Sequence, residues 1–372
     1  MNRSDNCQTL EEKIDSRLQR IANILLINGS FIDNPGLLNG KMGIAIFFYY
    51  YSQYTKNKIY EEYAGELIDE IYEEINASTP VDFKNGITGI GWGIEYLVKN
   101  KFVQADTDEV LVDIDNTIYK HRINSPILIN SGNDLFGYGH YHISRLLGHK
   151  IDDGDLNILI KKYHLIFLTD ECERILGQKL FTKFKIESLS IDTINSFIWF
   201  LLEIQKLEIF PVKVEKIFWS VPEYIEKGFQ DSSDKAGQTL LLRLTEKIIK
   251  AVSDKTNRNF FEKIIEKKNG ETVHSDNPEE TDVAYFIKNT WQQLIYSSCL
   301  TDGESFSFLS EDTFLIVDDE NNWKIRIDSL NKENLGLTGF AGLGLGLLKA
   351  QIEGHITKRS EHRAESKMQS VN

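Results

Sequence analysis

The stretch NGITGIGWGIEYL, residues 85–97, carries four closely spaced glycines and then runs into apolar side chains. GLTGFAGLGLGLLKA, residues 336–350, repeats this rhythm near the other end of the chain. Residues 35–50 and 131–148 are similar, and the four windows together hold 16 of the 25 glycines. Because glycine allows backbones to approach closely, these windows are expected where helices begin in a crowded part of the molecule.

The windows indicate a repeat with a period of about 50 residues, and therefore one repeating domain rather than two or three. Weaker copies without the glycine rhythm fill the gap between residues 150 and 330. Counting all of them gives seven units, which start near residues 40, 86, 134, 190, 234, 283 and 336.

Two kinds of helix alternate along the chain. The motif segments are apolar nearly all round, which is typical of a buried helix. Between them lie charged segments such as residues 61–75 and 106–119, in which apolar residues recur at helical spacing on one face. The sequence therefore predicts an all-α fold in which seven inner and seven outer helices stack, with the glycines favouring closure into a ring.

Some parts of the chain lie outside the repeat. Leu10 to Ile27 is predicted to form an extra amphipathic helix, and the repeats run from about residue 35. Residues 313–318 and 323–328 flank the turn-forming stretch DENN and predict a small β-hairpin before the last repeat. Residues 1–352 are expected to form a single domain, and 353–372 a polar, flexible tail.

Composition excludes several classes of protein. The net charge of -14 disfavours nucleic-acid binding, which needs a basic surface. No apolar run approaches the roughly 18 residues of a membrane helix, and the N-terminus lacks a signal-peptide pattern. We therefore expect a cytoplasmic protein without an integral membrane segment. Three widely separated cysteines exclude a disulfide-dense scaffold.

The two quoted stretches resemble the GLxGxGxGxxxL signature of the lanthionine synthetase C-like family. The resemblance implies an (α/α)7 toroid and a place in bacterial ribosomal peptide maturation, with a peptide substrate or a partner modification enzyme. Cyclases of this family join a peptide cysteine thiol to a dehydrated serine or threonine. A central zinc ion with three protein ligands holds the thiolate in those enzymes.

The sequence departs from the family pattern at each expected ligand. Ala284 stands where the cysteine of unit six would be. Leu337 and Thr338 stand where a Cys-His pair would precede Gly339. Residues 188–192, where unit four opens, lack the acid-base histidine. The sequence therefore predicts no metal site and no cofactor, and a zinc-less pseudoenzyme that binds a peptide or a partner.

Other residues are candidates for a ligand-binding mouth. Asp134 and Asp192 open units three and four, either as helix caps or as a general acid and base. His140 follows two glycines and is placed to line a central cavity, whereas His142 points the opposite way on a helix. Tyr285 and Thr338 complete the predicted mouth, which helix N-termini would make favourable for an anion or a peptide backbone.

Buried residues on the motif helices have simpler interpretations. Glu95 is expected to be paired or to face a cavity, because an ionised carboxylate is costly in an apolar setting. Trp92, Trp199 and Trp291 are expected in the core.

Two alternatives to a binding protein stay open. One is a metal-independent toroid enzyme, such as a carbohydrate-active hydrolase that uses Asp134 and Asp192. The other is a true lanthionine cyclase whose ligands lie elsewhere in the alignment.

Overall fold

The computed structural model describes residues 9–124, 132–147, 156–181, 190–272, 283–296 and 334–352, with Glu320, Trp323, Lys324 and Asn331. Every element in this part of the chain is helical, which confirms the predicted all-α class. None of the described helices combines the length and hydropathy that crossing a bilayer requires.

The seven motif helices lie where the repeat predicts them, and each begins within one turn of its expected start. They are α2 (Lys41–Thr55), α4 (Ile87–Lys99), α7 (Gly132–Leu147), α9 (Ile191–Lys206), α12 (Lys235–Ala251), α14 (Val283–Ile295) and a C-terminal helix over residues 340–352.

The helices between them are the predicted outer elements. They are α3 (Lys58–Glu74), α5 (Thr107–Val110), α6 (Val112–Asn124), α8 (Leu156–Phe181), α10 (Pro211–Phe218), α11 (Pro222–Asp231) and α13 (Lys255–Thr272). The extra helix α1 (Leu10–Asn28) precedes them and is followed by the short 3-10 helix η1 (Gly29–Phe31). Thr9 and Glu12 form a capping box at the start of α1.

The chain divides into two compact units. The first comprises Met1–Ile75, Glu279–Trp291 and Gly303–Asn372, and the second comprises Asn76–Pro278 and Gln292–Asp302. Whether residues 1–352 behave as a single domain stays a prediction, and the expected tail lies outside the described residues.

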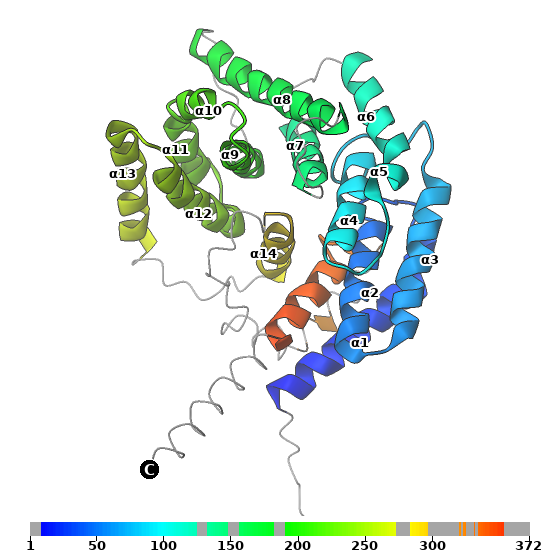
Figure 1. Ribbon diagram of the computed structural model, residues 1–372. Helices are drawn as coiled ribbons and strands as arrows, with labels where there is room; N and C mark the ends of the chain where they lie inside the picture. Colours follow the sequence, from blue (N-terminus) through cyan, green and yellow to red (C-terminus); the bar gives the residue numbers. More distant parts are fainter. Residues whose placement is uncertain are drawn as a thin grey trace, which may run out of the picture. The chain divides into compact units, whose positions relative to one another are not determined.

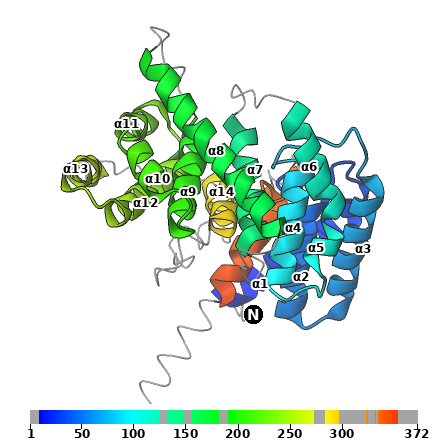
Figure 2. The same cartoon turned by 45° about the horizontal axis from the view of Figure 1, so that its top comes forward.

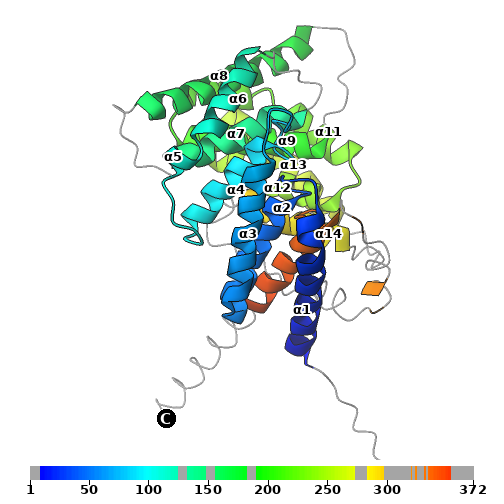
Figure 3. The ribbon, with the colours of Figure 1, turned by 90° about the vertical axis from the view of Figure 1, so that its right-hand side faces the viewer.

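In the first unit, the first and last motifs are in direct contact. The Thr338 backbone N–H donates to the Leu38 carbonyl at 3.0 Å, and the Thr338 hydroxyl donates to Asn39 Oδ1 at 2.6 Å. The C-terminal helix, red in the figures, lies beside α2 so closely that a Cβ on Gly344 would be 2.4 Å from the Phe47 ring (Figure 1, Figure 3). An α/α toroid needs such contacts between its first and last repeats.

In the second unit, successive motif helices pack side by side. Helix α4 contacts α7, α7 contacts α9, and α9 contacts α12, with α13 on the far side of α12 (Figure 1, Figure 2). Glycine is needed where α7 meets α9, because a Cβ on Gly139 would lie 2.6 Å from the Phe200 ring. The close approach expected from the glycine rhythm is thus present between consecutive motif helices.

Two local predictions differ from the structure. Trp323 and Lys324 are helical rather than extended, so the predicted strand is wrong for these two residues. Glu320, in the predicted turn, is also helical. The rest of the predicted 313–328 hairpin lies outside the described residues. Asp192 does not cap α9. The cap is Ser190, whose hydroxyl accepts from the Thr193 N–H at 3.2 Å.

Candidate functional site

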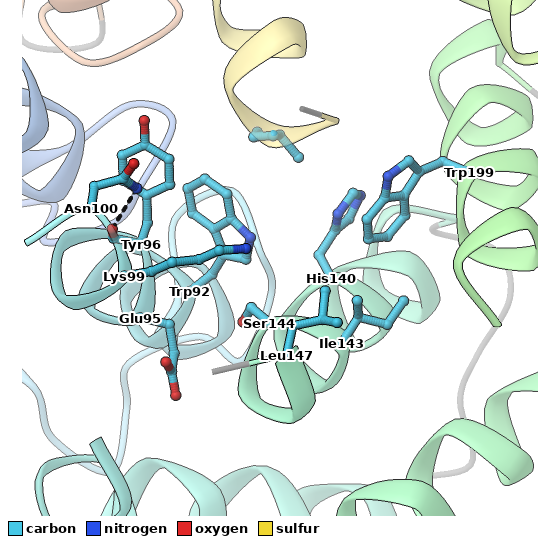
Figure 4. Close-up of a pocket in the computed structure, with 11 residues that line it drawn as sticks. Trp92, Glu95, Tyr96, Lys99, Asn100, His140, Ile143, Ser144, Leu147 and Trp199 are labelled. Atoms are coloured by element: carbon cyan, nitrogen blue, oxygen red, sulfur yellow. Dashed lines mark hydrogen bonds between the residues drawn. The ribbon is translucent and has the colours of Figure 1, made fainter. Parts of the chain in front are cut away.

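A cavity of about 320 Å³ lies in the second unit among the motif helices. Its walls come from α4, α7, α9 and the last residue of α14, at the C-terminal halves of α4 and α7 (Figure 4). The lining residues are Trp92, Glu95, Tyr96, Lys99, Asn100, His140, Ile143, Ser144, Leu147, Trp199 and Ile295.

Two stacked pairs of rings form much of the wall. Trp92 and Tyr96, one turn apart on α4, stack with ring centroids 5.1 Å apart and an interplanar angle of 20°. On the other side of the cavity, His140 of α7 stacks on Trp199 of α9 at 3.8 Å and 19° (Figure 4). The aromatic character of the wall therefore depends on the packing of three different helices.

Polar atoms inside the cavity wall lack partners. His140 and Trp199 are each only 3% exposed, and His140 Nδ1 and Trp199 Nε1 have no hydrogen-bond partner among the described residues. Buried polar atoms in folded proteins are nearly always hydrogen-bonded, and an exception calls for a physical explanation. Both nitrogen atoms have less than 1 Å² of accessible area, so they lie behind the cavity surface.

Burial lowers the pKa of His140 to about 3, because desolvation disfavours the charged imidazolium. The ring is therefore neutral at physiological pH and presents one N–H donor and one acceptor nitrogen. The ring of Tyr296 lies beside His140, with 5.2 Å between the ring centroids. Burial raises the pKa of Tyr296, and its hydroxyl is hydrogen-bonded to Ser196 at 2.7 Å.

The cavity opens toward the C-terminal end of α4. Lys99 and Asn100 are exposed, in contrast to the buried Trp92 and Trp199. The Asn100 side-chain amide donates to the Tyr96 carbonyl at 2.8 Å, which caps the helix end (Figure 4). A cation such as Lys99 is stabilised at this end of a helix by the partial negative charge of the last carbonyl groups.

A buried ion cluster fixes the two helices that carry most of the wall. Arg145 of α7, 1% exposed, pairs with Glu95 of α4 and with Asp108 and Asp115 of the outer helices at 2.7 and 2.8 Å. Lys161 of α8 also pairs with Asp108, at 2.8 Å. Burial lowers the pKa of Arg145, but hydrogen bonds to Asp115 and Glu95 outweigh this effect, so the pKa is raised overall. The expected pairing of Glu95 is confirmed.

Of the five residues predicted to form the mouth, His140 lines this cavity. Asp192 lies in the first turn of α9 and is half-buried, but it is not part of the lining. The Asp134 side chain lies outside the described side chains, so its role with Asp192 stays a prediction. Tyr285, half-buried on α14, and Thr338 belong to the first unit.

The two histidines of α7 face opposite ways, as their spacing predicts. His140 contacts Phe83, Trp199 and Tyr296, whereas His142 stacks on His164 of α8 at 4.3 Å.

The N-terminal ends of α2 and α4 differ from the expected anion-binding mouth. The Lys41 N–H donates to the Asn34 carbonyl and the Ile87 N–H to the Pro80 carbonyl, both at 2.9 Å. A Cβ on Gly86 would lie 2.1 Å from that Pro80 oxygen, so glycine here makes room for the chain's own acceptor. These first-turn donors are occupied within the protein, and Gly86 is the N-cap residue of α4.

The residues at the family's zinc-ligand positions do not fit a zinc ion. Ala284 is exposed and Leu337 is buried, and neither side chain has a donor atom. The Thr338 hydroxyl is already hydrogen-bonded to Asn39. Zinc in proteins is held by cysteine, histidine and carboxylate side chains. No group of three or more such side chains is placed to hold a metal ion within the described part of the chain.

The prediction that Trp92 and Trp199 are buried in the core is confirmed, whereas Trp291 is only half-buried. Sequence reasoning did not predict that Trp92 and Trp199 also line a cavity, and it missed most of the other residues of the wall. The helical spacing of the lining residues was a signal in the sequence for this wall. Trp92, Tyr96 and Lys99 lie at positions i, i+4 and i+7, and so do His140, Ser144 and Leu147. Each set occupies one helical face, which on a buried helix combines aromatic and polar residues.

The family model described as "Lanthionine synthetase C-like protein" matches residues 32–137. A search of curated proteins finds no significant match to the chain. The matched region covers the first two glycine motifs and the start of the third, and it includes residues 85–97 but not residues 336–350 of the two stretches that resemble the family signature. Residues 32–137 are therefore similar to the lanthionine synthetase C-like family.

Proposed function

We propose that this protein is a zinc-independent, peptide-binding member of this family that acts in the maturation of a ribosomally made peptide. The observation that carries the proposal is the aromatic cavity in the second unit, which two stacked ring pairs line. Similarity to the family suggests a peptide as the ligand. Ala284, Leu337 and Thr338 stand at the family's zinc-ligand positions, and their side chains argue against the zinc-dependent cyclase chemistry.

The cavity has the composition of a binding site. Ligand sites are typically concave and mostly apolar, with a few polar groups that fix orientation. Here rings and aliphatic side chains form most of the lining, and Lys99 and Asn100 supply polar groups. Ser144 also lines the cavity, but its hydroxyl donates to the Tyr141 carbonyl at 2.7 Å and is thereby engaged.

The first test measures metal content and peptide binding on the purified full chain. We expect no stoichiometric zinc by elemental analysis. We also expect saturable binding of a synthetic peptide with serine, threonine, tyrosine and cysteine residues, or of its thioether-bridged form. One equivalent of zinc together with ring formation on a dehydrated peptide would overturn the proposal.

A blocking variant locates the binding site. Ser144→Phe places a bulky ring in the cavity and should abolish binding of the peptide that the wild-type chain binds best. Val212→Phe adds a similar side chain on α10, where Val212 is 69% exposed, and should bind as wild type does. Equal binding by both variants would place the peptide elsewhere on the molecule.

A further inference from the structure

Helix α4 presents two aromatic rings and one cation to the cavity. Trp92, Tyr96 and Lys99 stand at positions i, i+4 and i+7, and all three belong to the lining. This spacing puts them on one face of the helix, with Tyr96 and Lys99 about 4.5 Å apart along its axis. Trp92 is buried, Tyr96 is half-buried and Lys99 is exposed, so this face runs from an apolar interior to a charged rim (Figure 4).

The other walls of the cavity are also uncharged. Ile143 and Leu147 of α7 and Ile295 of α14 contribute aliphatic side chains. The His140 ring is neutral, because burial lowers its pKa to about 3. A side chain that enters the cavity therefore meets apolar and aromatic surface, and its burial is favourable in proportion to its own apolar area.

The charge available to a ligand is that of Lys99. The lining contains two charged residues, and the carboxylate of the other, Glu95, turns toward Arg145 and is paired with it (Figure 4). Lys99 forms no ion pair with a carboxylate in the described part of the chain. The rim of the cavity therefore favours a ligand that carries a negative group next to an apolar one.

The C-terminal residue of a peptide combines these two groups within a short distance. Its α-carboxylate and its side chain are joined through Cα alone, so both fit a cavity of limited size. At about 320 Å³ the cavity is at the small end of the range for ligand sites, which is roughly 300–1,000 Å³. An aspartate or glutamate beside an apolar residue would need room for a second residue.

We propose that the cavity binds the C-terminal residue of the peptide, with its apolar side chain against Trp92 and Tyr96 and its α-carboxylate at Lys99. This inference rests on the proposed peptide-binding function and names the part of the peptide that the site recognises. A peptide whose C-terminus is amidated or extended loses the carboxylate from this position and keeps only the apolar contacts.

Titration calorimetry on the full chain with N-acetyl-phenylalanine, N-acetyl-phenylalaninamide and N-acetyl-alanine tests the inference. At low salt we expect the acid of phenylalanine to bind about fivefold more tightly than its amide, as for an ion pair with an exposed partner. This preference should approach one at about 1 M salt, where charges are screened within about 3 Å. N-acetyl-alanine should bind about tenfold or more weakly than N-acetyl-phenylalanine, because it lacks the ring. Equal affinity for acid and amide at low salt would overturn the inference.

Variants of Lys99 assign the carboxylate to its partner. Lys99→Met removes the charge and keeps an unbranched chain, so the preference for the acid should fall to about one, whereas Lys99→Arg should retain it. Lys101→Met is the matched control, because Lys101 is also exposed but lies outside the lining, and it should bind as wild type does. Circular dichroism checks that each variant is folded. A preference for the acid that survives Lys99→Met would contradict the proposed contact.

The pentapeptide Gly-Gly-Gly-Gly-Phe, as the free acid and as the C-terminal amide, separates this inference from the proposed function. Tighter binding of the free acid supports both. If the two forms bind equally, the inference fails and the peptide-binding function stands. If N-acetyl-phenylalanine binds through Lys99 and neither pentapeptide binds, the chemistry of the cavity stands and the peptide-binding function fails.

Discussion

The N-terminal ends and the middle parts of the motif helices in the second unit satisfy their polar groups differently. At the N-terminal ends, loop carbonyls and capping side chains occupy first-turn N–H groups, as at Ile87 and Thr193. Midway along α7 and α9, His140 and Trp199 keep buried nitrogen atoms without partners among the described residues. The glycine motif thus builds a closed helix start, and the cavity lies farther along the same helices.

The largest expected effect comes from breaking the ion cluster behind the cavity. Arg145→Met leaves three carboxylates without their common partner, and we expect the free energy of unfolding to fall by about 3–5 kcal/mol. Urea denaturation measures it. Arg174→Met is the control, because Arg174 is exposed and pairs with the half-buried Glu171 one turn away, so the loss should be less than about 1 kcal/mol. Similar losses in both variants would show that the cluster does not support the cavity.

Acid should weaken the fold through His140. Its pKa in the folded state, about 3, lies below the unfolded value near 6.5, so the unfolded chain binds a proton first as the pH falls. Stability from this group is therefore complete above pH 6.5 and is lost progressively toward pH 3. By pH 4 the loss is about 3 kcal/mol.

The matched variant for this prediction is His140→Phe, which keeps a ring between Phe83 and Trp199. Carboxylates elsewhere titrate in the same range, so the informative quantity is the difference in unfolding free energy between wild type and variant at pH 7 and pH 4. A pH dependence identical in the two proteins would show that His140 is not held neutral.

A smaller effect is expected at the N-terminal ends. Gly86→Ala forces a Cβ toward the Pro80 carbonyl, and we expect a loss of about 1–3 kcal/mol, as for other overpacked sites. Gly65→Ala, in α3, meets no atom within 4 Å and should instead stabilise the helix by about 0.5–1 kcal/mol. A harmless Gly86→Ala would argue that the loop carbonyl does not require glycine.

Much of the fold is predictable because its signals are local. Glycine rhythm and apolar periodicity placed the motif helices and α1, and the opposite directions of His140 and His142 follow from helical geometry alone. The hairpin prediction was wrong at Trp323 and Lys324, where propensity is a weak guide to backbone conformation. The capping role of Asp192 was wrong because Ser190, two residues earlier, was available as a cap.

The sequence by itself determined the repeat, the all-α class, the similarity of residues 32–137 to a known family, and the absence of zinc donors at Ala284, Leu337 and Thr338. Each of these depends on residue type at a fixed spacing. Only the tertiary structure decided that Trp92 and Trp199 line a cavity, that Glu95 pairs with Arg145, and that Thr338 joins the first and last motifs. These features depend on side chains from helices far apart in the chain, whose contacts arise only when the helices pack.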